Sequence, residues 1–143
     1  MFIGEYTHNL DSKNRITMPS KFRDGFGETF IITKGLDGCL TAYKMDQWEV
    51  LLSKLEQLPT TKRESRLYVR GITSKATECQ FDSQGRIQIP TYLITEADLV
   101  KQCVFVGVGS HVEIWSKERW EEYYKVASDS FEEIAESLTD FLK

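Results

Sequence analysis

The sequence predicts a mainly β fold with flanking helices, built from two similar halves within 143 residues. One observation is a repeated motif: LDSKNRITMPSKF at 10–22 is similar to FDSQGRIQIPTYL at 81–93. A second is that the similarity continues downstream, where GLDGCLTAYKMDQW (35–48) aligns with GVGSHVEIWSKERW (107–120). A third is the period-two alternation of apolar and polar residues on both sides of the first motif, which is typical of β-strands. A unit of about 45 residues is therefore expected to fold twice.

Each half is expected to begin with a β-hairpin whose turn carries the repeated Asp-Ser-x-x-Arg. Asp11 and Asp82 stand at the first turn position, where a carboxylate can accept backbone N–H groups. Asn14 and Gly85 stand where such a turn often needs a positive φ, which Asn and Gly tolerate. These four residues are the predicted turn-setting residues.

A short helix and a second hairpin are expected to follow each motif. Pro19 and Pro90 end the strand, because proline cannot donate to a β-ladder, and both suit the first turn of a helix. The runs TFIIT and CLTAY, and their counterparts CVFVGV and HVEIW, then predict two strands with a glycine-containing turn between them. Because each half alone is too small to bury much apolar surface, the halves are expected to interlock about a pseudo-twofold axis.

Helices are expected between the halves and after them. Capping-box patterns from Thr61 to Glu64 and from Ser130 to Glu133 predict two helix starts. Apolar stripes at helical spacing support the first linker helix, which Pro59 ends, and the last helix. The predicted division is 5–47 for the first domain, 48–75 for a helical linker, 76–119 for the second domain and 120–143 for a helical tail. The stripes are Trp48, Leu51, Leu52, Leu55 and Leu58 in the linker, and Phe131, Ile134, Leu138, Phe141 and Leu142 in the tail.

The charge is distributed unevenly along the chain. The net charge is −4, and residues 117–143 account for all of it with eight acidic and four basic residues. By contrast, residues 62–75 carry five bases and one acid. Arg63, Arg66 and Arg70 fall on one helical face, which is either a solvated surface or one that meets a partner's acidic groups or DNA. Bulk charge therefore does not exclude a polyanionic partner.

Several classes of function have little support in the sequence. Three cysteines without a CxxC spacing indicate reduced thiols. Because the chain has only two histidines, it offers few ligands for a metal site, and no metal or cofactor is expected. Glycine-rich phosphate loops, GxSxG and a plausible Cys–His pair are missing, so no enzyme activity is expected. The chain lacks the roughly 20 apolar residues of a membrane span and a signal-peptide pattern, which favours a cytoplasmic location.

The arginine that follows each turn is the candidate binding group. Arg15 and Arg86 can each present a planar fork of donors that matches a phosphate or the O6/N7 edge of guanine. The other reading is a local Asp–Arg salt bridge that only fastens the turn. Lys13 and Arg23 add positive charge near the first turn and favour the binding reading.

The repeated unit resembles the SpoVT/AbrB-like swapped-hairpin domain, and two of them in a chain of this length resemble the MraZ family of bacterial transcriptional regulators. The resemblance covers essentially the whole chain and rests on MFIGEY, DSKNR, DSQGR, PSKFR, ATECQFDSQGRIQIP and IWSKERWEEY. It implies a double-psi-type barrel in a cytoplasmic, nucleoid-associated protein. It also implies a homo-oligomeric ring that binds short direct repeats in double-stranded DNA, upstream of the operon for cell division and cell-wall synthesis, with no small-molecule substrate.

Carried over to this sequence, the family's DNA-contacting role falls on Arg15 and Arg86. Lys13 and Arg23 are expected additions in the first half, where Asn14 replaces the family's usual glycine. The second half has Gln84 in place of the lysine and Ile94 in place of the second arginine, so the first hairpin is expected to contribute more affinity. The alternative is an antitoxin-like or structural protein-interaction module without specific DNA binding.

Overall fold

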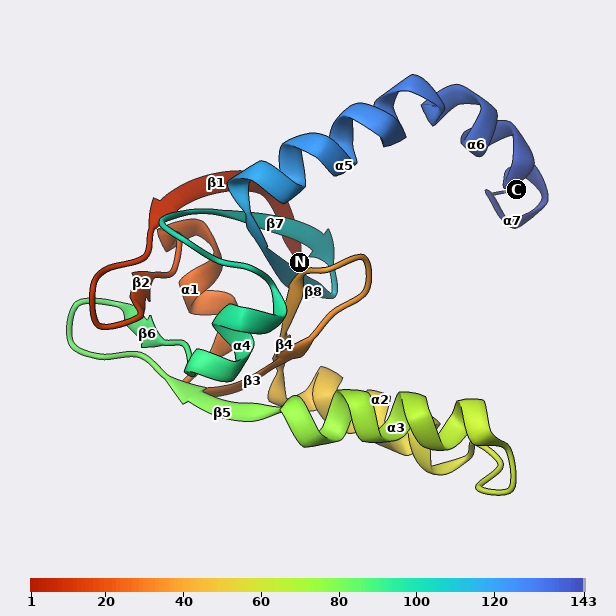
Figure 1. The fold of residues 1–143 in the computed structure, drawn as a ribbon, viewed down its shortest axis with the longest axis horizontal. Coiled ribbons are helices and arrows are strands. Elements are labelled where there is room, and N and C mark those ends of the chain that lie inside the picture. The colour runs from red at the N-terminus through yellow and green to blue at the C-terminus, as the bar shows by residue number, and fades with distance from the viewer. Residues whose placement is uncertain (143) are drawn as a thin grey trace.

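The structure is a computed structural model that describes residues 1–142, and it confirms a mainly β fold with flanking helices (Figure 1). The first half contains strands β1 to β4 and helix α1, the second contains β5 to β8 and α4, and the remaining helices lie between and after the halves. The elements are β1 (Phe2–Asn9), β2 (Arg15–Thr17), α1 (Ser20–Phe26), β3 (Thr29–Lys34), β4 (Leu40–Lys44), α2 (Met45–Glu56), α3 (Arg63–Lys75), β5 (Thr77–Gln80), β6 (Arg86–Gln88), α4 (Thr91–Glu96), β7 (Gln102–Gly109), β8 (His111–Ser116), α5 (Lys117–Asp129), α6 (Phe131–Ser137) and α7 (Thr139–Leu142).

The order of strands in the large sheet is palindromic when repeat-equivalent strands (β1 and β5, β3 and β7, β4 and β8) are treated as the same strand. The large sheet has the order β1-β7-β8-β4-β3-β5, and β2 and β6 form a separate two-stranded ribbon. All pairs are antiparallel. Where the halves meet, repeat-equivalent residues face each other: Ile16 pairs with Ile87, and Thr41 with Glu113. A pseudo-twofold axis therefore passes through both contacts.

The strands on either side of each Asp-Ser turn do not pair with each other, so the predicted first hairpin is wrong. β1 pairs with β7, β5 pairs with β3, and β2 pairs with β6, so each half gives its first two strands to the other half. The alternation of apolar residues shows which face of a strand is buried but carries no information about its partner. The predicted second hairpins, β3–β4 and β7–β8, are confirmed.

The main core lies between the β2–β6 ribbon and the large sheet, with α1 and α4 filling the space (Figure 1). Helices α2 and α3 cover the opposite face of β3, and α5 covers the opposite face of β7 and β8. Alternate residues of one strand therefore serve two cores. The main core includes Ile16, Met18, Phe22, Phe30, Ile32, Leu40, Ile87, Ile89, Leu93, Phe105 and Ile114.

The helix starts differ from the predicted capping boxes. α3 has Lys62 as its N-cap and α6 has Ser130, and neither has a side-chain cap hydrogen bond. Thr61 lies one residue before the cap position, and Ser130 has φ −112° and ψ 9°, outside the extended conformation of a capping residue. A side-chain cap is found instead at α5, where the Ser116 hydroxyl accepts the Arg119 N–H at 3.1 Å.

The strand pairings found in residues 1–142 do not close either sheet into a barrel. The three cysteines are free and buried, and burial raises the pKa of the Cys79 thiol to about 12 and that of Cys103 to about 11. Among the described helices none has the length and apolar character needed to cross a bilayer. In the same residues, no three His, Cys, Asp or Glu side chains lie close enough together to hold a metal ion.

Candidate nucleic-acid interface

The two Asp-Ser-x-x-Arg turns have the same hydrogen bonds. In the first, Asp11 Oδ1 accepts the backbone N–H groups of Lys13 at 2.9 Å and Arg15 at 2.8 Å, while Oδ2 accepts Arg15 Nε at 2.8 Å. In the second, Asp82 Oδ1 accepts the N–H groups of Gln84 and Arg86, each at 2.9 Å, and Oδ2 accepts Arg86 Nε at 2.7 Å. Each carboxylate thus fixes both the backbone of its turn and the orientation of its arginine.

Each turn is also tethered to the opposite half. Asn14 and Gly85 have φ of 61° and 75°, the left-handed conformation that their residue types tolerate best. The Asn14 carbonyl accepts the N–H of Ile89 at 2.9 Å, and the Gly85 carbonyl accepts the N–H of Met18 at 3.1 Å. The two turns therefore hold each other in place across the pseudo-twofold axis.

Arg15 and Arg86 lie on one face of the β2–β6 ribbon. Arg15 is opposite Gln88 and Arg86 is opposite Thr17, on the face away from the buried Ile16–Ile87 pair. Diagonal neighbours in such a ribbon are roughly 7–8 Å apart. The side chains of Arg15 and Arg86 are 30% and 26% exposed, and across residues 1–142 their terminal amino groups donate no hydrogen bond. The salt bridge to aspartate uses only Nε and leaves two donor groups for a ligand.

The electrostatics of the turns follow from these hydrogen bonds. The Arg15 backbone N–H, helped by the Arg15 guanidinium and the Lys13 N–H, holds the pKa of the Asp11 carboxyl below its usual value of 3.8. The Arg86 backbone N–H and guanidinium do the same for the pKa of Asp82. Both carboxylates therefore stay ionised at neutral pH, and both guanidinium groups stay anchored.

The remaining predicted site residues are not all near these arginines. Lys13 is exposed at the first turn. Arg23 is half-buried under the second turn, with Nη2 donating to the Met18 carbonyl at 3.3 Å and Nε buried without a hydrogen-bond partner in the described chain. The Arg23 guanidinium occupies the space that a side chain at position 85 would need, so it packs directly on the Gly85 backbone. Its repeat equivalent, Ile94, packs against the main core.

The arginines of α3 lie elsewhere. Helix α3, which carries Arg63, Arg66 and Arg70, extends from the side of the molecule opposite to the β2–β6 ribbon (Figure 1). Helix α3 is therefore not part of the ribbon face. Thr17 and Gln88 are the ribbon-face residues that the sequence analysis missed. Pairing the two repeats antiparallel about Ile16 and Ile87 would have placed both beside the arginines.

The fold and the site together define a class: duplicated β proteins whose halves exchange strands and present two aspartate-anchored arginines on one face. Comparison with known proteins identifies the family. The model of one family, described as "MraZ protein, putative antitoxin-like", matches the chain twice, over residues 1–71 and 72–142.

Curated relatives agree over nearly the full length. The chain is 49% identical to "Transcriptional regulator MraZ" of Ligilactobacillus salivarius, with 99% of each chain covered. It is 51% identical to the protein of that name from Limosilactobacillus reuteri, with 96% of this chain and 97% of the relative covered. It is 50% identical to that of Caldanaerobacter subterraneus, with 99% of each covered. The chain belongs to the MraZ family.

Proposed function

We propose that this protein is a sequence-specific DNA-binding transcriptional regulator that binds short direct repeats in promoter DNA through its two arginine turns. The main supporting observation is that Arg15 and Arg86 lie on one face of one ribbon, each oriented by an aspartate. The terminal donors of both arginines pair with no group in the described residues. Relatives about half identical to the chain are named transcriptional regulators. The proposed location is the cytoplasm, in association with the nucleoid, and the proposed target lies upstream of the operon for cell division and cell-wall synthesis.

The ribbon has the right form for the major groove. B-DNA admits a two-stranded β-ribbon in this groove, and an arginine there can donate two hydrogen bonds to O6 and N7 of guanine. Gln88 lies on the same face and can contact a neighbouring base, although it already donates to the Lys13 carbonyl at 2.6 Å. Lys13 at the rim of the turn suits a phosphate contact, which adds affinity without sequence preference. Arg23 supports the second turn from below, so its proposed contribution to DNA binding is positional.

One copy does not supply enough discrimination by itself. A bidentate arginine–guanine contact discriminates by about 1–3 kcal/mol, which is too little for operator specificity. A homo-oligomeric ring that engages several boxes multiplies this gain through effective concentration. Boxes spaced about 10 base pairs apart would face the same side of the duplex. The repeat-equivalent contacts across the pseudo-twofold axis support two domains near 5–47 and 76–119, in the proposed double-psi-type arrangement.

The test is binding of upstream DNA by Arg15→Ala and Arg86→Ala at several salt concentrations. Each substitution is expected to weaken specific binding by about 10- to 100-fold and to reduce the preference over unrelated DNA. Lys13→Ala should weaken binding to all sequences alike and lower the salt slope by about one. Lys54→Ala, exposed on α2, is the control and should bind like the wild type.

A further variant separates charge from shape. Arg15→Lys keeps the positive charge but loses the planar fork, so it should retain non-specific binding and lose the preference for the repeat. If both alanine variants keep the full sequence preference, Arg15 and Arg86 only fasten their turns. The proposal would then give way to a protein-interaction module, which the antitoxin-like family description also accommodates.

A further inference from the structure

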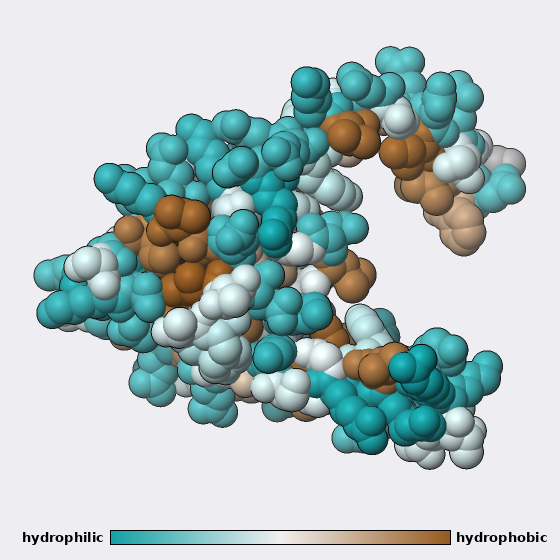
Figure 2. Space-filling view, in the orientation of Figure 1, coloured by the Kyte–Doolittle hydropathy of each residue, from teal (hydrophilic) through white to brown (hydrophobic). Residues whose placement is uncertain are grey.

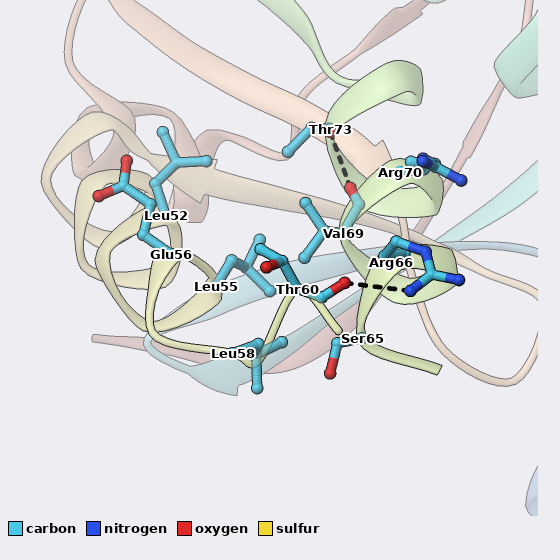
Figure 3. Close-up of a pocket in the computed structure, with 10 residues that line it drawn as sticks. All are labelled: Leu52, Leu55, Glu56, Leu58, Thr60, Ser65, Arg66, Val69, Arg70 and Thr73. Atoms are coloured by element: carbon cyan, nitrogen blue, oxygen red, sulfur yellow. Dashed lines mark hydrogen bonds between the residues drawn. The ribbon is translucent and has the colours of Figure 1, made fainter. Parts of the chain in front are cut away.

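An open pocket lies between α2 and α3 (Figure 3), and these helices are at the end of the molecule away from the ribbon (Figure 1). Its volume is about 600 Å³, and its wall is formed largely by Leu52, Leu55, Leu58 and Val69. We call this pocket the α2–α3 groove. Because Leu52, Leu58 and Val69 are only half-buried, the groove keeps apolar surface in contact with water. Such a concave apolar surface is suited to the apolar side of a helical segment.

The edge of the groove on α3 is basic. Arg66 lies along it with Nη1 donating to the Thr60 carbonyl at 3.0 Å, and Arg70 lies one turn further on (Figure 3). No hydrogen bond or ion pair is found for the guanidinium groups of Arg63 and Arg70 within residues 1–142. Residues 62–75 carry five bases and one acid. Glu56 of α2 is the acidic residue in the lining, and Arg66 and Arg70 outnumber it. An acidic ligand is therefore favoured at the α3 edge of this groove.

The last twelve described residues, 131–142, have the complementary character, and we call them the tail. The tail forms α6 and α7 and has no buried residue. Phe131 is 70% and Phe141 is 84% exposed, and Ile134, Leu138 and Leu142 are exposed at helical spacing between and after them. The tail contains four acidic residues and no basic one. Figure 2 shows its apolar side chains gathered on the side that faces the opening between the two helical arms.

We propose that the tail of one copy docks in the α2–α3 groove of a second copy. The apolar stripe of the tail would pack on the leucines and Val69, as amphipathic helices do in hydrophobic grooves. Its acidic residues would lie near Arg63, Arg66 and Arg70, for which residues 1–142 of the same copy show no ion pair with an acidic group. This inference rests on the oligomeric part of the proposed function and names the surfaces that join its subunits.

The position of the tail favours a second copy over its own groove. α5 is 13 residues long, so it carries the tail about 20 Å away from the sheet. In Figures 1 and 2 the α2–α3 arm and the α5–α7 arm project to the same side with open space between them. Groove and tail are different surfaces of one chain, so each docked copy leaves a free groove and a free tail for the next. A head-to-tail interface of this kind generates a ring when its rotation closes.

The test uses two full-length variants whose defects are complementary. The groove variant is Arg63→Glu with Arg70→Glu, and the tail variant is Phe131→Asp with Phe141→Asp. All four side chains are exposed or without partners, so both variants are expected to fold. The matched control is Lys101→Glu, an exposed charge reversal outside groove and tail. Mass is measured by sedimentation velocity without DNA.

Wild type and control are expected to form the same closed oligomer, and each variant alone is expected to be a monomer. Each variant should associate at least about 30-fold more weakly than wild type, since one central interface side chain contributes about 2 kcal/mol. The mixture should give a one-to-one dimer that grows no further, because the groove variant still has a tail and the tail variant still has a groove.

Three outcomes overturn the inference: a monomeric wild type, a variant that assembles like wild type, or a mixture that stays monomeric. The last result would mean that the tail folds onto its own chain or meets another partner. Arg15→Ala and Arg86→Ala lie outside both surfaces and should assemble normally. Loss of DNA binding in those variants and loss of assembly in the groove and tail variants therefore report independently.

Discussion

At the residue scale, each turn aspartate holds the backbone of its turn and the orientation of its arginine with the same carboxylate. Asp11 and Asp82 accept two backbone N–H groups on one oxygen and an arginine Nε on the other. The structural and the DNA-binding readings of Asp-x-x-x-Arg are consequently not exclusive. A salt bridge through Nε aligns the guanidinium and leaves its terminal donors for a ligand.

Gly85→Ala is expected to be more destabilising than a positive φ alone explains. Gly85 has a φ of 75°, which costs an alanine about 1–2 kcal/mol. An added Cβ would also meet the Arg23 guanidinium, which packs on this glycine. Displacing Arg23 should add about 1 kcal/mol or more. Urea unfolding of Gly85→Ala in the wild-type and Arg23→Ala backgrounds measures the two contributions.

Arg23→Ala provides the control for this prediction. In the Arg23→Ala background the cost of Gly85→Ala should fall to the part caused by the positive φ, because the clash with the guanidinium is gone. An equal cost of Gly85→Ala in both backgrounds would contradict the packing of Arg23 on the second turn.

The turn aspartates predict a pH dependence of stability. The folded pKa values of Asp11 and Asp82 are lower than the unfolded value near 3.8, mainly through the backbone N–H groups of Arg15 and Arg86. Their contribution is therefore fully present above pH 3.8 and is lost as the pH falls through the folded values. The difference in unfolding free energy between wild type and Asp11→Asn should narrow over this window. Ser12→Ala, at an exposed neighbour without an ionisable side chain, is the control, and its difference from wild type should not narrow over this window.

At the element scale, β3 joins the two sides of the molecule. Phe30 and Ile32 face the main core, while Ile31 faces α2 and α3. Thr33 is fully buried, and its hydroxyl donates to the Ile72 carbonyl of α3 at 2.6 Å. This hydrogen bond connects the helical arm, and therefore the α2–α3 groove, to the sheet.

Thr33→Val is expected to lower the free energy of unfolding by about 1–3 kcal/mol, because it leaves the Ile72 carbonyl without its buried donor. The nearly equal size of valine excludes a large cavity as the cause. Thr29→Val, at the start of the same strand and with no side-chain hydrogen bond in the described structure, is the matched control and should change stability by less than about 0.5 kcal/mol. Urea unfolding distinguishes them, and equal effects would refute a special role for the Thr33–Ile72 contact.

At the scale of the whole molecule, the duplication produces one unit with two equivalent turns. The palindromic strand order and the pairing of Ile16 with Ile87 place both turns on one ribbon. The helical arms project to the other side, where a second copy can dock without covering the ribbon (Figure 1). The proposed DNA-binding surface and the proposed assembly surfaces are therefore separate parts of the same chain.

The proposed ring predicts a dependence of DNA affinity on the spacing of the repeats. Inserting about 5 base pairs between two boxes rotates one to the opposite side of the duplex and should remove most of the multivalent gain, at least about 10-fold in affinity. Inserting about 10 base pairs returns the box to the same side and should cost less. Gel-shift titration of the three DNAs tests this, and equal affinity for all of them would argue against simultaneous engagement of neighbouring boxes.

The sequence by itself determined the repeat, the β-rich character, the turn positions and the identity of the anchored arginines. These features depend on local chemistry: a carboxylate that reaches nearby N–H groups, Asn14 and Gly85 at positive φ, and apolar alternation. The family resemblance could also be stated from the motifs, and the comparisons confirm it.

Only the tertiary structure decided which strands pair, where Arg23 lies and which ribbon residues join the arginines. Strand partners depend on burial shared between distant segments, and the pairing of β1 with β7 joins residues about a hundred positions apart. Arg23 is half-buried and not on the predicted surface, because its guanidinium packs on Gly85 of the second turn. Gly85 has no side chain that would block this position. The local sequence pattern determines the conformation of a residue and the face on which it lies, whereas packing between distant segments determines which residues it contacts.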